Sequence, residues 1–101
     1  MKALQIFEPG AQTVYTIEVA AQLANVPRRL IVVYYKHGLV SPVTDPAGSG
    51  WCFDDEAIRT VRRIEYLRSA CGLNLAGVKF VMALMDEVER LRAELRFHHR
   101  T

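Results

Sequence analysis

Residues 16–38 read TIEVAAQLANVPRRLIVVYYKHG, and this stretch decides the fold. Thr16 is a good N-cap residue for a short helix over residues 17–24, in which apolar side chains recur at helical spacing. Asn25-Val26 forms a tight turn, and Pro27 suits the first turn of a second helix, where its missing N–H leaves no hydrogen bond unmade. The stretch therefore predicts two short helices joined by a tight turn, a helix-turn-helix.

The second helix is expected to run to about His37 and to stop at Gly38. Prolines and glycines then recur through residues 39–53, so no helix is expected there. Short apolar runs at Leu39-Val40 and Trp51-Cys52-Phe53 flank this segment, which favours a β-hairpin wing.

Two further helices follow the predicted wing. Asp54 or Asp55 caps a third helix, which reaches about Ala70 and is terminated by Gly72. Its apolar face is formed by Ile58, Val61, Ile64, Leu67 and Cys71. Asn74 caps a last helix over residues 75–98.

The last helix carries two apolar stripes. The first is expected to pack on the domain and consists of Leu75, Val78, Met82 and Met85. The second steps alternately by three and four residues, as the a and d positions of a coiled coil do; we call it the seam, and it consists of Val81, Leu84, Val88, Leu91 and Leu95. Packing within one chain would also cover a seam of little more than two heptads. We favour self-association as an antiparallel helix pair, with the seam as the dimer interface.

Together these elements predict a single domain of 101 residues, all-α apart from a small β-hairpin wing. Residues 1–14 are expected to form an extended arm, residues 15–72 the winged helix-turn-helix, and residues 73–101 the C-terminal coiled-coil helix.

Composition and patterning exclude several classes of protein. The net charge of +2 is too small to imply a nucleic-acid partner by itself. Cys52 and Cys71 have no partners at metal-ligand spacing, so reduced thiols are expected and neither a disulfide nor a metal site. Residues 1–10 mix polar residues into the apolar ones, which argues against a signal peptide, and no apolar run reaches membrane-spanning length. A cytoplasmic protein is expected.

Catalysis finds little support in the sequence. His98 and His99 fall near the end of the last helix, and no Ser/His/Asp or Cys/His arrangement can be assembled. Helix capping explains Asp54 and Asp55 better than a pair of catalytic carboxylates does. No catalytic residue, cofactor or metal ligand is predicted.

Binding of DNA and binding of protein remain as alternatives for the second helix. Recognition helices contact base edges mainly from their N-terminal residues, where Arg28 and Arg29 lie. The exposed face then continues through Val32 and Tyr35 before it reaches Lys36. A valine donates no hydrogen bond to a base or a phosphate, so this face is half apolar.

The wing shows the same pattern. Trp51 and Cys52 supply almost no charge where a wing would touch the DNA backbone, and carboxylates follow them at Asp54, Asp55 and Glu56. An exposed aromatic beside an apolar helix face favours a protein-binding patch. Trp51 could equally fold into the core between the wing and the third helix.

Three segments of this sequence resemble the MerR-type regulator domain, especially its heat-shock repressor branch. They are Tyr15-Thr16-Ile17 with Val19–Leu23, Tyr34 with Gly38–Pro42, and Leu73–Lys79. Trp51–Asp55 and Leu84–Leu91 look most like the MerR-like chaperone-modulator proteins called CbpM. The resemblance implies binding to the J-domain of a DnaJ-type co-chaperone, CbpA, and inhibition of its action with the Hsp70 chaperone DnaK.

The resemblance also implies which charges meet the partner. J-domains present a basic surface to Hsp70, so acidic residues should face it: Asp54, Asp55 and Glu56, or Asp86, Glu87 and Glu89, with the first set favoured. The predicted partner-binding residues are therefore Val32, Tyr35, Trp51, Asp54, Asp55 and Glu56.

The alternative is a MerR-type transcriptional regulator. Such proteins usually carry arginine at the position of Val32 and an arginine pair where Trp51-Cys52 stand, so these residues depart from the DNA-binding pattern. The residues that could contact DNA are Arg28, Arg29, Lys36 and Arg59. A ligand sensor would need a pocket-forming domain, for which too few residues are expected after Leu95.

Overall fold

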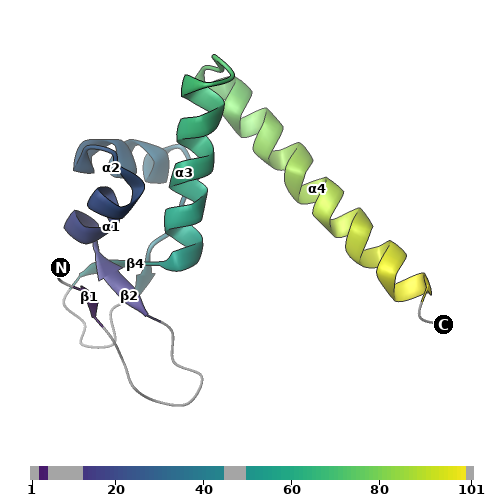
Figure 1. The fold of residues 1–101 in the computed structure, drawn as a ribbon, viewed down its shortest axis with the longest axis horizontal. Helices are drawn as coiled ribbons and strands as arrows, with labels where there is room; N and C mark the ends of the chain where they lie inside the picture. Colours follow the sequence, from purple (N-terminus) through teal and green to yellow (C-terminus); the bar gives the residue numbers. More distant parts are fainter. Residues whose placement is uncertain (1–2, 5–12, 45–49, 100–101) are drawn as a thin grey trace. The chain divides into compact units, whose positions relative to one another are not determined.

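The structure is a computed structural model that describes residues 3–4, 13–44 and 50–99. The chain divides into two compact units, residues 1–65 and 66–101. In chain order the elements are β1 (Ala3–Leu4), β2 (Val14–Thr16), α1 (Ile17–Ala24), α2 (Arg28–Lys36), β3 (Val43–Thr44), β4 (Trp51–Asp54), α3 (Asp55–Ser69) and α4 (Leu75–His99) (Figure 1). The predicted fold class, mostly helical with a small wing, is confirmed.

The helix-turn-helix forms as the local sequence signals predict. The Thr16 hydroxyl accepts a hydrogen bond from the Val19 N–H at 3.3 Å and so caps α1. Asn25 adopts a left-handed conformation with φ 58°, and the turn brings the Val26 N–H to the Ala21 carbonyl at 3.0 Å. All of these contacts lie within six residues of sequence, so the turn is specified by local sequence.

The end of α2 is a Schellman motif built around Gly38, whose φ is +74°. The Gly38 N–H donates to the Tyr35 carbonyl and the Leu39 N–H donates to the Tyr34 carbonyl, both at 2.9 Å. A left-handed residue is required at this place, which is why the glycine predicted the helix end correctly.

The core of the first unit lies between α1, α2, β4 and the first turns of α3. Its largest fully buried side chains include Ile31, Tyr34, Phe53, Val61 and Ile64. The buried Tyr34 hydroxyl donates to the Glu65 carboxylate, which satisfies a polar group inside the core. Arg62 donates to the Leu23 carbonyl at 2.7 Å and ties α3 to the end of α1.

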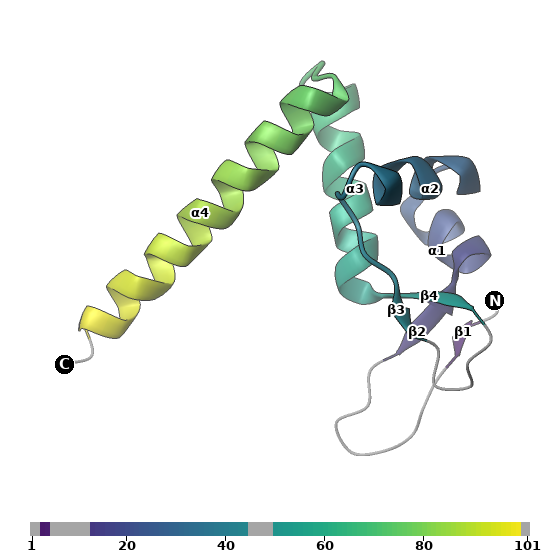
Figure 2. The same ribbon diagram turned by 180° about the vertical axis from the view of Figure 1, so that it is seen from behind.

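The four strands form one antiparallel sheet in the order β1-β2-β4-β3, with β3 beside β4 (Figure 2). The two-stranded wing is confirmed, but its first strand is β3, Val43–Thr44, and the prediction of Leu39-Val40 is wrong. Val40 is buried instead, and Pro42 cannot donate to a strand ladder, so pairing begins after it. Most of the predicted N-terminal arm, residues 5–12, lies outside the described residues.

Helix α3, Asp55–Ser69, begins at the predicted cap and ends within one residue of the predicted Ala70. Asp54 accepts a hydrogen bond from the Ala57 N–H at 2.9 Å and is the cap. Four of the five predicted face residues are buried: Ile58, Val61, Ile64 and Leu67. The placement of Cys71 in this face is wrong, because the helix stops at Ser69 and the thiol is exposed.

Helix α4 begins at the predicted cap, since Asn74 accepts a hydrogen bond from the Gly77 N–H at 2.8 Å. Among the described residues of this helix, Val78 alone is fully buried. The seam residues Leu84, Val88, Leu91 and Leu95 are 51%, 46%, 45% and 58% exposed, and Val81 is half-buried. Within the described ranges, no helix has the length and apolar character to cross a membrane.

Candidate functional site

Two aromatic side chains from different elements meet at the surface of the first unit. The rings of Tyr35 on α2 and Trp51 on β4 lie 4.4 Å apart between centroids and are tilted by 60°. Tyr35 is 40% exposed and Trp51 is 44% exposed. Phe53 also contacts the indole edge-on, with 6.4 Å between ring centroids. Trp51 is therefore partly exposed and packed against other rings. Of the two alternatives left open by the sequence, an exposed aromatic and a core residue, the structure shows the exposed one.

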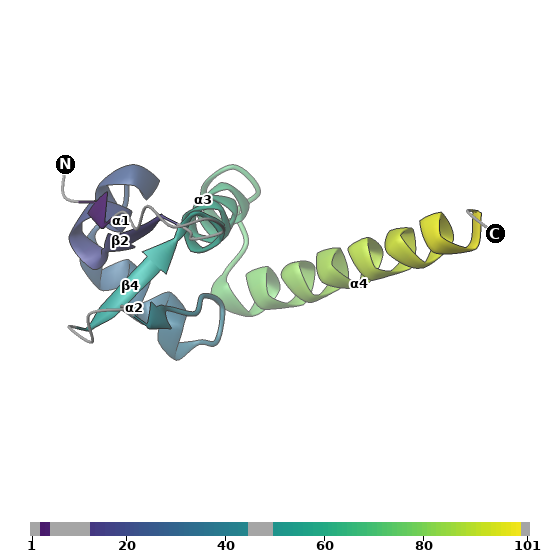
Figure 3. The same ribbon diagram turned by 90° about the horizontal axis from the view of Figure 1, so that it is seen from below.

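Val32 lies on the same side of α2 as Tyr35, because residues three apart are neighbours on a helix surface. We call Val32, Tyr35 and Trp51 the aromatic face. The ribbons of α2 and β4 overlap in the view of Figure 3, and the ring contact between Tyr35 and Trp51 joins the two elements. Cys52, the other wing residue without charge, is buried and contributes nothing to this surface.

A groove of about 390 Å³ runs beside the aromatic face. It is lined by Thr16, Ile17, Glu18, Arg28, Val32 and Trp51. Glu18 and Arg28 form an ion pair with 3.4 Å between nitrogen and oxygen, and both side chains are largely exposed. Sequence reasoning missed Glu18, because its partner lies on the next helix and no local pattern marks a pair across the turn.

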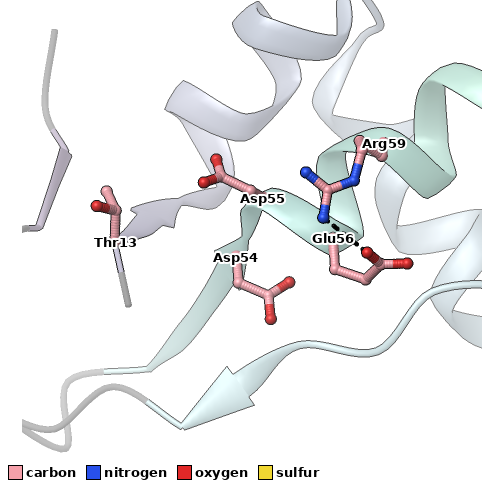
Figure 4. A pocket seen from close by; sticks show the side chains of 5 residues that line it. All are labelled: Thr13, Asp54, Asp55, Glu56 and Arg59. Atoms are coloured by element: carbon pink, nitrogen blue, oxygen red, sulfur yellow. Dashed lines mark hydrogen bonds and ion pairs between the residues drawn. The ribbon is translucent and has the colours of Figure 1, made fainter. Parts of the chain in front are cut away.

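The predicted acidic residues line a second, separate pocket of about 500 Å³ (Figure 4). Its lining consists of Thr13, Asp54, Asp55, Glu56 and Arg59. Neither Val32 nor Trp51 belongs to it, and none of the three carboxylates lines the groove. The residues that the sequence grouped into one partner site thus lie in two places, one toward each end of β4.

Each carboxylate of this acidic pocket has an interaction within the chain. Asp54 caps α3, Asp55 accepts a hydrogen bond from the Tyr15 hydroxyl at 2.9 Å, and Glu56 pairs with Arg59 at 2.7 Å. The hydrogen bond to Asp55 holds the Tyr15 proton and raises the pKa of that phenol above its ordinary value. The hydrogen bond to Glu56 raises the pKa of Arg59 in the same way.

The residues predicted for DNA contact divide into two pairs. Arg28 and Arg59 are engaged by Glu18 and Glu56. Arg29 and Lys36 are exposed, and neither forms an ion pair within the described part of the chain. Two of the four candidate cations are therefore partly neutralised by neighbouring carboxylates.

A family model described as "MerR HTH family regulatory protein" matches residues 15–84. The chain belongs to the MerR helix-turn-helix family. This match covers the helix-turn-helix, the wing, α3 and the first turns of α4.

Relatives within the MerR family carry two kinds of name. The heat shock protein HspR of Streptomyces coelicolor is 38% identical over 79% of this chain, which spans only 52% of that protein. The chaperone modulatory protein CbpM of Pseudomonas putida (strain GB-1) is 33% identical over 72% of this chain and 71% of its own length. CbpM of Citrobacter koseri is 36% identical over 58% of this chain and 57% of its own length. The likeness to CbpM inferred from the wing is confirmed, and the likeness to the heat-shock repressor branch stands beside it.

Proposed function

We propose that this MerR-family chain is a chaperone modulator that binds the J-domain of a DnaJ-type co-chaperone of the CbpA kind. Binding would hide the J-domain surface that Hsp70 needs and so inhibit their joint action. The observation that carries the proposal is the aromatic face, where Val32, Tyr35 and Trp51 stand at the meeting point of second helix and wing. A DNA-binding MerR protein would need hydrogen-bond donors at that place.

The aromatic face supplies the anchor of the proposed interface. Partly exposed aromatic side chains already packed against each other lose little conformational entropy on binding and remove a large apolar area from water. The carboxylates of the acidic pocket, Asp54, Asp55 and Glu56, would face the basic part of the J-domain and act mainly on the association rate.

We further propose that the chain forms a homodimer through the seam of α4. Leu84, Val88, Leu91 and Leu95 are each 45% exposed or more, and the spacing of the five seam residues is that of a coiled coil. A second copy of the helix, placed antiparallel, would cover them. Ion pairs from Arg90 to Glu87 and Glu94 lie beside the seam and leave its apolar residues uncovered.

The proposal is tested by titrating the full chain with the full-length DnaJ-type co-chaperone of the same organism, using calorimetry. Wild type is expected to bind, and Trp51→Ala to bind at least about 30-fold more weakly, as loss of an anchoring aromatic does. Tyr66→Ala is the matched control, because Tyr66 is a 63% exposed aromatic on α3 outside the aromatic face. Absence of binding by wild type would overturn the proposal.

A second candidate function is DNA binding in the manner of a MerR-type transcriptional regulator. Arg29 and Lys36 on α2 favour it, since both are exposed and neither is paired with a carboxylate in the described ranges, and so does the 38% identity to HspR. A gel-shift with the protein's own promoter at moderate salt decides between the two. Sequence-selective binding with a steep salt dependence would establish the DNA function.

A further inference from the structure

The aromatic face has a rim of positive charge. Arg28, Arg29 and Lys36 lie three or four residues from Val32 along α2, a spacing that places them around it on the helix surface. All three side chains are exposed. Among the described residues, Glu18 is the one carboxylate that lines the adjoining groove, and it forms an ion pair with Arg28.

The negative charge of this region gathers at the other end of β4. Asp54, Asp55 and Glu56 line their own pocket with Arg59, and no residue in the described part of the chain lines both this pocket and the groove at Trp51. The four residues of β4 rise about 3.3 Å each, so roughly 10 Å of strand separates the two ends. A partner that covers both places would therefore be complementary if it carried negative charge opposite the aromatic face and positive charge opposite the acidic pocket.

We propose that the aromatic face docks an acidic protein segment in which an apolar side chain is flanked by carboxylates. The apolar side chain packs on Val32, Tyr35 and Trp51, and the carboxylates pair with Arg29 and Lys36. This inference rests on the proposed function, since the segment belongs to the J-domain co-chaperone. The complete partner surface then carries both signs, acidic opposite α2 and basic opposite the acidic pocket.

A protein segment fits this face better than a nucleic acid does. Both are anionic, but a nucleic acid needs donors across the whole contact, and the centre of this face offers a valine and two aromatic rings. An apolar centre ringed by polar groups is the usual arrangement of a protein interface, in which the rim keeps water from the anchor. Arg28, the cation nearest the groove, is also partly neutralised by Glu18.

Charge reversal on α2 tests the inference in the full chain, with binding to the co-chaperone measured by calorimetry. The double variant Arg29→Glu/Lys36→Glu is expected to bind at least about tenfold more weakly than wild type, with Arg29→Gln/Lys36→Gln in between, since like charges repel across an interface. Arg63→Glu/Lys79→Glu, at two exposed cations on α3 and α4 outside the aromatic face, changes the net charge by the same amount and is expected to bind as wild type does. Circular dichroism checks that each variant is folded.

The outcomes separate the inference from the proposed function. If wild type does not bind the co-chaperone, the proposed function is overturned, and so is the assignment of a co-chaperone segment to the aromatic face. If wild type binds and the glutamate variant binds equally or more tightly, the inference fails while the proposed function stands. If wild type instead prefers duplex DNA at physiological salt and the glutamate variant loses it, the face is a nucleic-acid site and the inference is overturned.

Discussion

Trp51 is the residue on which the functional argument rests, and it is also the single tryptophan of the chain. Its indole contacts the rings of Tyr35 and Phe53 while 44% of its surface stays exposed. That combination fixes the orientation of the side chain and leaves one region of it available to a partner. A free surface tryptophan would have to be ordered on binding, and a core tryptophan would be out of reach.

Intrinsic fluorescence therefore reports directly on the aromatic face. We expect acrylamide to quench Trp51 in the free protein, since the indole is partly exposed. Binding of the DnaJ-type co-chaperone should shift the emission to shorter wavelength and reduce quenching, as burial removes water from the ring. The signal of a co-chaperone with its own tryptophans is subtracted using Trp51→Phe. Unchanged quenching in a saturated complex would place the contact elsewhere.

Two substitutions of Asp54 distinguish its role as a helix cap from the role of its charge. Asp54→Ala removes the cap on the Ala57 N–H and is expected to lower the free energy of unfolding by about 1 kcal/mol. Asp54→Asn keeps a capping oxygen and removes the charge, so it should leave stability nearly unchanged. Urea denaturation measures both. If the two variants are equally destabilised, the charge matters for stability and not the cap alone.

Tyr15 gives a pH-dependent prediction. Its hydrogen bond to Asp55 raises the pKa of the phenol in the folded state, so the stabilisation is complete below the ordinary tyrosine pKa of about 10 and is lost as pH rises through the folded value. We expect the difference in urea midpoint between wild type and Tyr15→Phe to be present at about pH 8 and to shrink as pH rises through the raised pKa of the folded phenol. The other tyrosines are common to both proteins. A difference that does not vary with pH would exclude this hydrogen bond as the cause.

At the scale of the elements, local sequence signals predict where the helices begin and end, but they do not predict which strands pair. Thr16, Gly38 and Asn74 marked helix ends because caps act within a few residues of sequence. The sequence predicts only the two-stranded wing, whereas the sheet also contains β1 and β2. Strand β2 pairs with β4 across the whole helix-turn-helix, and no local sequence pattern indicates such a pairing. Strands of two to four residues are also too short for alternation to show.

The arrangement of the candidate site is likewise only partly predictable from local sequence. Val32, Tyr35 and Trp51 could be grouped because helical spacing and the expected wing position place them together. Asp54 and Glu56 are close to Trp51 in sequence, which suggests the same surface. The structure places them in another pocket. A strand carries its residues steadily apart, so neighbours in sequence come to serve different surfaces.

Helix α4 yields the prediction for assembly. Leu84→Glu/Leu91→Glu puts two carboxylates into the seam and is expected to convert the proposed dimer to a monomer, since burying an unpaired charge opposes association. Ala93→Glu is the matched control, because Ala93 is exposed on the same helix but outside the seam. Sedimentation equilibrium gives the mass of each. An unchanged mass in the double variant would show that the seam is not the interface.

For the whole molecule, the distribution of charge carries more information than its sum. A net charge of +2 suggests no partner, yet the first unit presents a cationic rim around the aromatic face and a separate acidic pocket. A uniformly anionic partner such as duplex DNA matches only one of these surfaces. A protein partner with charges of both signs matches both, which agrees with the proposed role.

Weak salt dependence follows from that arrangement. Binding to the co-chaperone is expected to fall only modestly between about 50 and 200 mM salt, because few ion pairs surround an apolar anchor. DNA binding through several phosphate contacts would lose roughly a thousandfold or more over the same range. Titrations at both salt concentrations measure the slope, with Arg63→Glu as a control for bulk charge. A steep slope would favour the DNA-binding alternative.

The central claim, inhibition of a J-domain co-chaperone, is tested most directly by the ATPase rate of Hsp70 stimulated by that co-chaperone. Adding the wild-type chain in stoichiometric amounts should bring the rate back toward that of Hsp70 alone, while Trp51→Ala should leave the stimulation largely intact. Stimulation that persists at saturating wild-type chain would contradict the account.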